Sequence, residues 1–370
     1  MVPIATRYLF SDRIRLVISA GGVAFAVLLI VLMVALYQGI LDRAGRVAEA
    51  APASLWVAQA GVPDPSHGAS ILPAATFDQL RSVEGVEAAQ PLLARTMLVG
   101  TSPNLGAFSF VMALPDGPLQ KSAAEAFGIG ILPEPGQIVL SRVVADEIGA
   151  AIGDAVFIGT TPFEVARVSA LVEGAFSSTV AVSAVDATPL FGHPEAFSYA
   201  LVTIDPGADV VAVANAIEEA LPGTNALTPA EFAAVTRREV QQDFLPVIGV
   251  LIGVAFVVGL AVIALTIYTS TVERARDYGV LKAVGASAGQ LFSIVMRQSL
   301  IVALIGYAAG TALAIGAGAM LEEAVPEFAT LYRWQDLLAV LGVSLLMSGI
   351  AAVVPIRRLA RIDPAVVFRA

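Results

Sequence analysis

Four long apolar segments constrain the fold of this chain more than any other feature of its sequence. None of the four contains an Asp, Glu, Lys, Arg or His residue. At about 1.5 Å of rise per residue, a helix built from each segment roughly matches the hydrocarbon core of a bilayer, which is about 30 Å thick. We therefore expect four transmembrane helices, at Val17–Tyr37, Phe244–Tyr268, Gln298–Met320 and Leu337–Pro355.

Composition supports a membrane protein. Hydrophobic residues make up 57% of the 370 residues and charged residues 14%, whereas soluble domains are about 45–50% apolar and about 25% charged. Val17–Tyr37 is longer than a signal-peptide core of about 7–15 residues, so we expect it to be an uncleaved anchor. The chain has no cysteine, which excludes disulfides, Cys-ligated metals and Cys nucleophiles.

The distribution of charge predicts how the helices are oriented. Basic residues outnumber acidic ones in segments 1–16, 269–297 and 355–370, whereas segment 39–243 carries nine basic and 23 acidic residues. Because Lys and Arg gather on the cytoplasmic side of a membrane, both termini are expected in the cytoplasm and segment 39–243 outside. We expect a location in the inner (plasma) membrane, with lipid but no nucleic acid as a partner.

The segment 39–243 alternates short strand and helix patterns, which predict one α+β domain of two lobes. A hairpin turn is expected at Thr161-Pro162, and a helix cap at Thr76. The expected strands are Ser54–Gln59, Val86–Leu93, Gly106–Leu114, Ala155–Thr160, Phe163–Ser169 and Tyr199–Asp205, and the expected helices are Thr76–Val83, Ser141–Ala150 and Ala208–Leu221.

A helix start is predicted just before the second apolar segment. Thr228, Pro229 and Glu231 occupy the N-cap, N1 and N3 positions of a capping box. No helix breaker follows until Pro246, so this helix is expected to continue almost directly into the membrane. A tilt of the outer domain would then be transmitted to the membrane.

Segments rich in Pro and Gly at 61–73, 114–118 and 131–136 predict surface loops. Both histidines of the chain, His67 and His193, fall in such loops. Metal or haem ligation is one interpretation of these histidines, and the plainer one is a solvated loop residue. We expect no metal site in this chain.

The stretch Val272–Ser287 lies between two apolar segments and contains a dense group of charges, among them Glu273 and Arg276. These two residues are three apart and can pair on one face of a short helix, while Gly285 can end that helix. The pattern allows either a helix held at the membrane surface for another protein to contact or an ordinary cytoplasmic loop.

Small residues recur within the apolar segments at a spacing that lets helices pack closely, in Gly249-xxx-Gly253 and Gly306-xxx-Gly310. Packing within one chain and a dimer seam are equally consistent with this pattern. The absence of ionisable residues from the apolar segments argues against an ion channel or a proton-coupled carrier. No phosphate-binding loop or H-E-x-x-H motif occurs, so an enzyme is not expected.

The stretch VERARDYGVLKAVGAS at 272–287 resembles the signature of the FtsX-like ABC permeases of the MacB, LolC and DevC class, in which E-R-x-R-[DE]-[FY]-G-[VI]-L-[KR]-A-[VIL]-G follows the second span. Residues 148–168 are similar to the family's external domain, and the ending Arg361-Ile362-Asp363-Pro364-Ala365 is similar to its tail. The opening segment 11–40, together with Trp56, most resembles the DevC and HrtB branch.

This resemblance implies a mechanotransmission permease: four transmembrane helices with a large MacB-like periplasmic α+β domain between the first and second. It implies a homodimer, or a dimer with a similar subunit, bound to two ABC ATPase subunits that bind ATP and Mg²⁺, with no cofactor in this chain. MacB itself carries an ATPase domain; none is recognised here, so we expect a separate ATPase chain. The implied divisions are 1–38, 39–243, 244–268, 269–288 as the coupling helix, and 289–370.

The resemblance also implies site residues. The ATPase would contact the coupling helix through Glu273, Arg274, Arg276, Asp277, Tyr278, Gly279, Leu281, Lys282 and Gly285. One implied function is export or extraction of a hydrophobic or amphipathic molecule such as haem or a glycolipid, with a periplasmic adaptor as a possible partner. Weak candidates for substrate contact are Met33, Tyr37, Tyr268 and Met296. The alternative is transmembrane signalling that controls a cell-wall hydrolase, as in FtsX itself.

Overall fold

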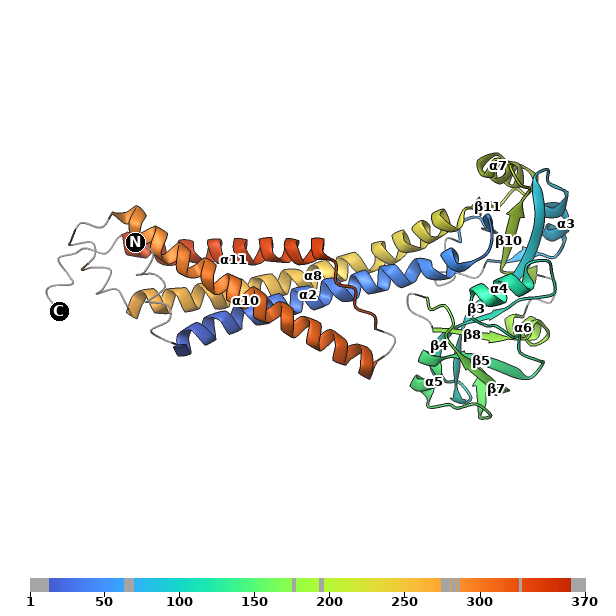
Figure 1. Ribbon diagram of the computed structural model, residues 1–370, viewed down its shortest axis with the longest axis horizontal. Helices are drawn as coiled ribbons and strands as arrows, with labels where there is room; N and C mark the ends of the chain where they lie inside the picture. The colour runs from blue at the N-terminus through green and yellow to red at the C-terminus, as the bar shows by residue number, and fades with distance from the viewer. Residues whose placement is uncertain are drawn as a thin grey trace. The chain divides into compact units, whose positions relative to one another are not determined.

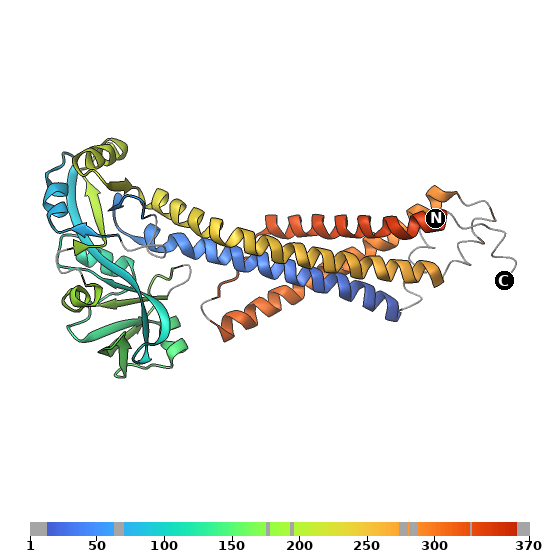
Figure 2. The same cartoon turned by 180° about the vertical axis from the view of Figure 1, so that it is seen from behind.

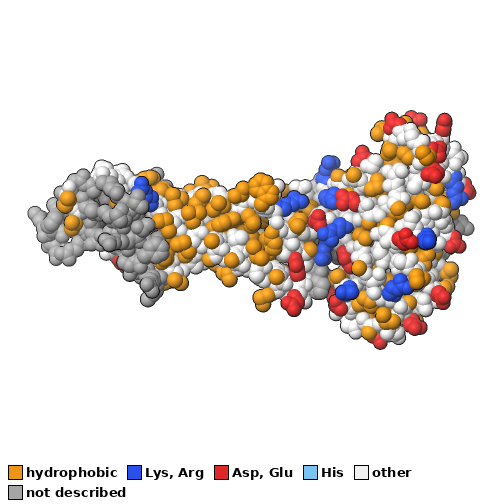
Figure 3. Space-filling model, viewed as in Figure 1, with side chains coloured by type: hydrophobic (Ala, Val, Ile, Leu, Met, Phe, Trp, Pro, Cys, Tyr) orange, Lys and Arg blue, Asp and Glu red, His pale blue; other side chains and the backbone are white. Residues whose placement is uncertain are grey.

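The computed structural model describes residues 13–62, 70–174, 178–192, 196–273, 280, 284, 287–325 and 328–360. The chain divides into two compact units. The helical unit comprises Met1–Gln38, Phe244–Ala324 and Thr330–Ala370, and the sheet unit comprises Gly39–Asp243 with Val325–Ala329. Figure 3 shows apolar side chains covering the visible face of the helical unit, whereas charged side chains gather over the sheet unit.

The helical unit is built from four helices that are long and apolar enough to cross a membrane, which confirms the predicted fold class. Two of them continue beyond the unit: the first extends past the apolar segment that ends at Tyr37, and the second begins well before Phe244. The four helices are α2 (Arg13–Ala50), α8 (Pro229–Glu273), α10 (Ala288–Ala324) and α11 (Trp334–Ala360).

Helix α2 lies at the centre of the helical unit. It has 44% of its most apolar stretch buried, against 17% for α8, and Figures 1 and 2 show these two helices side by side from opposite directions. Gly22 of α2 lies against Val262 of α8, and Ala26 lies against Gly259, so the two helices run antiparallel. Small side chains at these contacts let the helices approach closely, as is usual in membranes.

Two buried serines join α10 to α11. The hydroxyl of Ser299 donates to the carbonyl oxygen of Ser348 at 2.8 Å, and the hydroxyl of Ser348 donates to the carbonyl oxygen of Ser299 at 2.9 Å. Side-chain hydrogen bonds of this kind hold membrane helices together, because lipid offers no alternative partner. Further along the pair, the hydroxyl of Tyr307 on α10 donates to the carbonyl oxygen of Leu337 on α11 at 3.0 Å, so the two helices run antiparallel.

The sheet unit contains a nine-stranded mixed sheet in the order β11-β1-β10-β3-β4-β8-β5-β7-β6. Strand β3 also pairs with β6, so the last six strands of the order close on themselves as a small barrel. The strands are β1 (Leu55–Gln59), β3 (Val86–Ser102), β4 (Leu105–Ala113), β5 (Gln137–Ser141), β6 (Ala155–Ile158), β7 (Thr161–Ser169), β8 (Ser178–Val182), β10 (Tyr199–Ile204) and β11 (Thr224–Leu227).

Helices cover the sheet, and three hydrophobic clusters fill the unit. One cluster occupies the barrel around Val99, Ile138 and Val180; a second lies between β1, β10 and the helices α3 and α7; the third surrounds Trp56. The remaining elements are α3 (Ala75–Ser82), α4 (Gln120–Ala126), α5 (Arg142–Ile148), α6 (Ala184–Phe191), α7 (Val210–Ala220), β2 (Leu72–Pro73) and β9 (Ala196–Phe197).

Three local predictions in this unit are wrong. Thr76 does not cap α3: the helix begins at Ala75, its N-cap is Ala74, and the Thr76 side chain is buried. The β6–β7 turn lies at 159–160 rather than at Thr161-Pro162, because Gly159 adopts the positive φ of 62° that the turn needs. Strand β3 extends to Ser102 instead of Leu93, since its second half pairs with β4.

Candidate transmission site

The ends of α2 and α8 meet inside the sheet unit, at residues 39–50 and 229–243, which we call the helix pair. One side chain of α8, Arg237, joins them. Its Nη2 lies 2.8 Å from Oε1 of Glu49, and its Nε donates to the carbonyl oxygen of Leu41 at 3.2 Å. Gly45 of α2 lies against the guanidinium group of Arg237, and a Cβ at this position would overlap that group. The helix pair is therefore held by a charged contact and a backbone contact at once.

The ion pair between Arg237 and Glu49 contributes little to the stability of the sheet unit. The side chains of Arg237 and Glu49 are 34% and 45% exposed, and half-exposed ion pairs contribute only about 0–1 kcal/mol. The bond to a main-chain oxygen adds direction, because the planar guanidinium has donors at fixed angles. Arg237 thus adds a directional contact within the helix pair and little to the stability of the unit.

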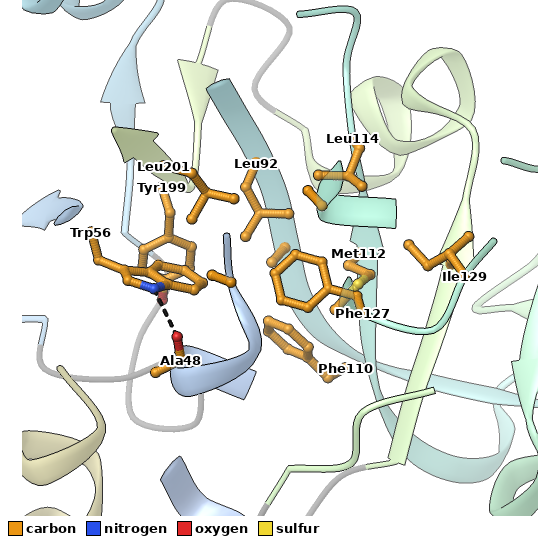
Figure 4. Packing of buried hydrophobic residues seen from close by; sticks show 14 of the residues in the cluster. Ala48, Trp56, Leu92, Phe110, Met112, Leu114, Phe127, Ile129, Tyr199 and Leu201 are labelled. Atoms are coloured by element: carbon orange, nitrogen blue, oxygen red, sulfur yellow. Dashed lines mark hydrogen bonds between the residues drawn. The ribbon is translucent and has the colours of Figure 1, made fainter. Parts of the chain in front are cut away.

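Trp56 of β1 anchors both helices of the pair to the sheet. Its side chain is 1% exposed, and its Nε1 donates to the carbonyl oxygen of Ala48 in the last turn of α2 at 3.1 Å (Figure 4). Its ring stacks on Phe232 in the first turn of α8 with centroids 5.0 Å apart, and it meets Tyr199 of β10 edge-on at 5.6 Å. One buried indole therefore touches the end of α2, the start of α8 and the neighbouring strand.

The first turn of α8 has the predicted capping box. The Thr228 hydroxyl oxygen accepts from the Glu231 N–H at 3.2 Å, and the Glu231 carboxylate accepts from the Thr228 N–H at 2.9 Å. These bonds satisfy donors that a helix start would otherwise leave unpaired. The predicted continuation is also confirmed, since α8 runs from Pro229 through Pro246 to Glu273.

A second link joins α2 to the barrel. Burial raises the pKa of Glu173, which follows β7, while hydrogen bonds from Ser141 and Thr179 and the positive charge of Arg43 on α2 oppose that rise. The Thr179 N–H donates to the Glu173 carboxylate at 3.0 Å. The positive charge of Arg43 therefore offsets part of the cost of burying this carboxylate.

Comparison with known proteins decides the family. Residues 16–220 match the MacB-like periplasmic core domain, and residues 249–364 match the FtsX-like permease C-terminal region. The first match alone covers more than half of the chain. The chain belongs to the FtsX-like, MacB-type ABC transporter permeases. This confirms the resemblance to the FtsX-like and MacB-type permeases.

Individual relatives match over parts of this permease. An uncharacterized ABC transporter permease of Methanocaldococcus jannaschii is 28% identical over 47% of this chain and 46% of its own length. The macrolide export ATP-binding/permease protein MacB of a Shewanella species is 25% identical over 59% of this chain and 34% of its own length. The chain spans less than half the length of these relatives. The solved periplasmic region of MacB from Actinobacillus actinomycetemcomitans aligns over 49% of this chain and 90% of that structure, with 11% identity and a TM-score of 0.37.

One predicted coupling residue of the permease, Glu273, is described, and it belongs to α8. Glu273 is the last residue of that helix. Val280 and Val284, which belong to the same stretch, are exposed. The other predicted coupling residues lie outside the described residues; they are Arg274, Arg276, Asp277, Tyr278, Gly279, Leu281, Lys282 and Gly285. His67 and His193 also lie outside them, and no metal-binding group of three or more His, Cys, Asp or Glu side chains occurs in the part of the chain that is described.

The two predicted glycine motifs have different surroundings. An added Cβ at Gly306 would lie 2.5 Å from Cβ of Val23, and one at Gly310 would lie 2.5 Å from the carbonyl oxygen of Ala24. The α10 motif therefore packs against α2 of the same chain. Gly249 and Gly253 of α8 have no atom of the described chain within 4 Å of an added Cβ, so their face is open to lipid or to another subunit.

This difference makes a testable prediction. Gly310→Leu should lower the stability of the detergent-solubilised permease by about 1–3 kcal/mol, because the added side chain overpacks the α2 interface. Gly253→Leu is the matched control and should leave monomer stability unchanged. Thermal unfolding followed by circular dichroism measures both variants. Equal destabilisation by the two substitutions would contradict the assignment of the α10 motif to contact within the chain.

The four weak substrate candidates do not converge on one site. The contacts Gly22–Val262 and Ala26–Gly259 set the alignment of the antiparallel helices α2 and α8. In this alignment Met33 of α2 and Tyr268 of α8 lie about 25 Å apart along the helix axis, at about 1.5 Å per residue. Gly306 and Gly310 of α10 contact Val23 and Ala24 of α2 in the same order, so these two helices run parallel. Met296 lies ten residues before Gly306 and is therefore at the same end of the helical unit as Tyr268. Tyr37 lies one turn beyond Met33, at the opposite end.

No pattern in the sequence indicates the contacts of Arg237 or the hydrogen bond and ring contacts of Trp56. In the sequence, Arg237 is one of several charged residues before an apolar segment, and Gly45 follows the predicted first span, which ends at Tyr37. Only the extension of α2 to Ala50 brings these residues together. A helix pattern continuing past Tyr37, with no Pro before residue 50, is the signal that could have indicated it.

Proposed function

We propose that this permease couples ATP hydrolysis by a separate ATPase subunit to movement of its sheet unit, and so exports or extracts a hydrophobic or amphipathic substrate. One observation carries the proposal: α2 and α8 each run without a break from the helical unit into the sheet unit, where they are joined by Arg237 and anchored by Trp56. Rigid secondary-structure elements are the usual carriers of motion between distant sites. A shift at the Glu273 end of α8 would therefore reach the sheet.

The assembly that fits this proposal is a dimer with two ATPase subunits. ATP and Mg²⁺ bind to the ATPase, and the stretch 273–285 at the end of α8 contacts it. Basic residues are in excess in this stretch and at both termini, which favours placing all three segments on the cytoplasmic side of an inner membrane. The name of the Shewanella relative, a macrolide exporter, supports an amphipathic substrate.

ATPase turnover tests the proposal. The chain is purified with its co-purifying ATPase, and haem, glycolipids or hydrophobic peptides are titrated into the assay. We expect at least one such ligand to stimulate turnover. A response to a cell-wall hydrolase alone would replace export with signalling, and turnover that is indifferent to the permease would overturn the coupling itself.

Matched variants of α8 sharpen the assay. Gln242→Pro removes one backbone N–H and places a ring against the carbonyl of Arg238, which kinks or breaks a helix at a cost of about 3 kcal/mol. Gln242 is exposed, so Gln242→Ala changes the surface without changing the helix. Ligand stimulation should disappear in the proline variant and persist in the alanine variant, while basal turnover remains in both.

A further inference from the structure

Two of the predicted Pro/Gly-rich loops meet at a cleft in the sheet unit. The cleft has a volume of about 460 Å³ and lies between the loop after β4, the loop before β5 and the start of α6. Figure 1 shows α4 and α6, which contribute Gln120 and Thr188 to its walls. Small-molecule sites in proteins have about this size, 300–1,000 Å³. None of its lining residues takes part in the transmission site described above.

Buried side chains hold the first wall in place. Gln90 of β3 is completely buried, and its Nε2 donates to the carbonyl oxygen of Pro115 at 2.7 Å. The Oε1 of the same amide accepts from the N–H of Leu119 at 3.2 Å. One amide thus fixes both ends of the loop that lines the cleft.

Asp186 of α6 ties the other two walls together. Its Oδ2 accepts from the N–H of Gly136 at 2.8 Å, and the hydroxyl of Ser183 donates to the same oxygen at 2.7 Å. The loop before β5 is therefore bonded to the first turn of α6. Because all three walls are fixed before any ligand arrives, little conformational entropy would be lost on binding.

The chemistry of the lining is apolar with one charge. Apolar side chains form most of the surface, including Leu114, Leu132, Pro133 and Val185, and Val185 is 70% exposed at the rim. The single charged lining residue is Asp116. One of its oxygens accepts from Nε2 of Gln120 at 3.1 Å, so that amide orients the carboxylate without neutralising it.

We propose that this cleft binds an amphipathic organic cation, with the apolar body against the proline, leucine and valine walls and the positive group beside Asp116. The excess of acidic over basic residues in segment 39–243 favours cations near the surface of the unit. The step from binding to export rests on the proposed function, but the binding does not. The cleft would therefore define the class of substrate that the permease takes.

Protection of a single cysteine tests the cleft in the intact permease, because the natural chain has no cysteine. Val185→Cys is reconstituted in neutral phosphatidylcholine nanodiscs, and its rate of modification by a water-soluble maleimide is measured. Tetraphenylphosphonium should slow modification, whereas tetraphenylborate, of the same shape and opposite charge, should not. Val211→Cys on α7, with an exposure of 66% against 70%, is the matched control and should not be protected.

Asp116→Asn supplies the second variant, since the amide keeps the shape and the acceptor for Gln120. In this background the phosphonium concentration for half-protection should rise about two- to fivefold, as expected for one exposed charge pair. Equal protection by both probes, protection at Val211→Cys, or no effect of Asp116→Asn would each overturn the proposal. The assay contains no ATPase, so its failure is distinct from a failure of ligand-stimulated turnover.

Discussion

Exchanging the charges at Glu273 and Arg276 is expected to release the ATPase from the permease. In the double variant Glu273→Arg/Arg276→Glu the two side chains remain three residues apart and can still pair with each other. Toward a partner, however, each presents the opposite charge. Disrupting hydrogen-bonded charges at an interface costs about 2–5 kcal/mol, so affinity should fall by about thirtyfold or more. Arg276 lies outside the described residues, and this prediction rests on the sequence signature and the end of α8.

Co-purification and ATP turnover measure the effect. The matched control exchanges Asp42 and Arg46, an i,i+4 ion pair on α2 in the sheet unit, and should leave ATPase association intact. Cysteine at the exposed position Val211 reports insertion and sidedness in every variant. An unchanged ratio of ATPase to permease, with unchanged turnover, would remove the coupling assignment from this stretch. Labelling of Val284→Cys and Val211→Cys from the same side of the membrane would contradict it as well.

Trp56→Ala is expected to have the largest effect on the sheet unit. Removing a fully buried tryptophan costs about 3–5 kcal/mol, because a cavity replaces its contacts. Here it also removes the only described donor from β1 to the end of α2 and the ring that packs on Phe232. At temperatures where the variant is still folded, ligand stimulation of the ATPase should be lost, because the helix pair is no longer anchored to the sheet. Circular dichroism and the turnover assay measure the two effects.

Phe77→Ala separates stability from transmission. Phe77 is 5% exposed and packs edge-on against Phe197 at 4.8 Å, in a cluster that contains neither Ala48 nor Phe232. Its loss should cost a similar 3–5 kcal/mol or so while ligand stimulation persists in the folded protein. If Phe77→Ala abolishes stimulation as fully as Trp56→Ala does, Trp56 has no special part in transmission.

The sequence predicted the elements whose signals are local. Runs of apolar residues identify transmembrane helices because lipid demands a long uncharged surface, and all four were found. The capping box at Thr228 was recognisable because its bonds span three residues. The signature at 273–285 was visible for the same reason and lies within the matched FtsX-like region 249–364, while its contact with an ATPase stays a prediction. The cap predicted at Thr76 was wrong: the helix begins one residue earlier, at Ala75, and the Thr76 side chain is buried inside the fold, which a local pattern does not show.

Only the tertiary structure decided how distant segments meet. Arg237 and Leu41 are 196 residues apart in sequence, and Gln90 reaches a loop 25 residues away, so no local pattern records either contact. The closure of the barrel depends on β3 continuing to Ser102 and pairing with β6. The sequence thus determined which segments are long and apolar enough to enter the membrane, because hydrophobicity acts residue by residue. The anchoring of the helix pair and the walls of the cleft arise only on folding, because they need side chains from separate elements to share one buried volume.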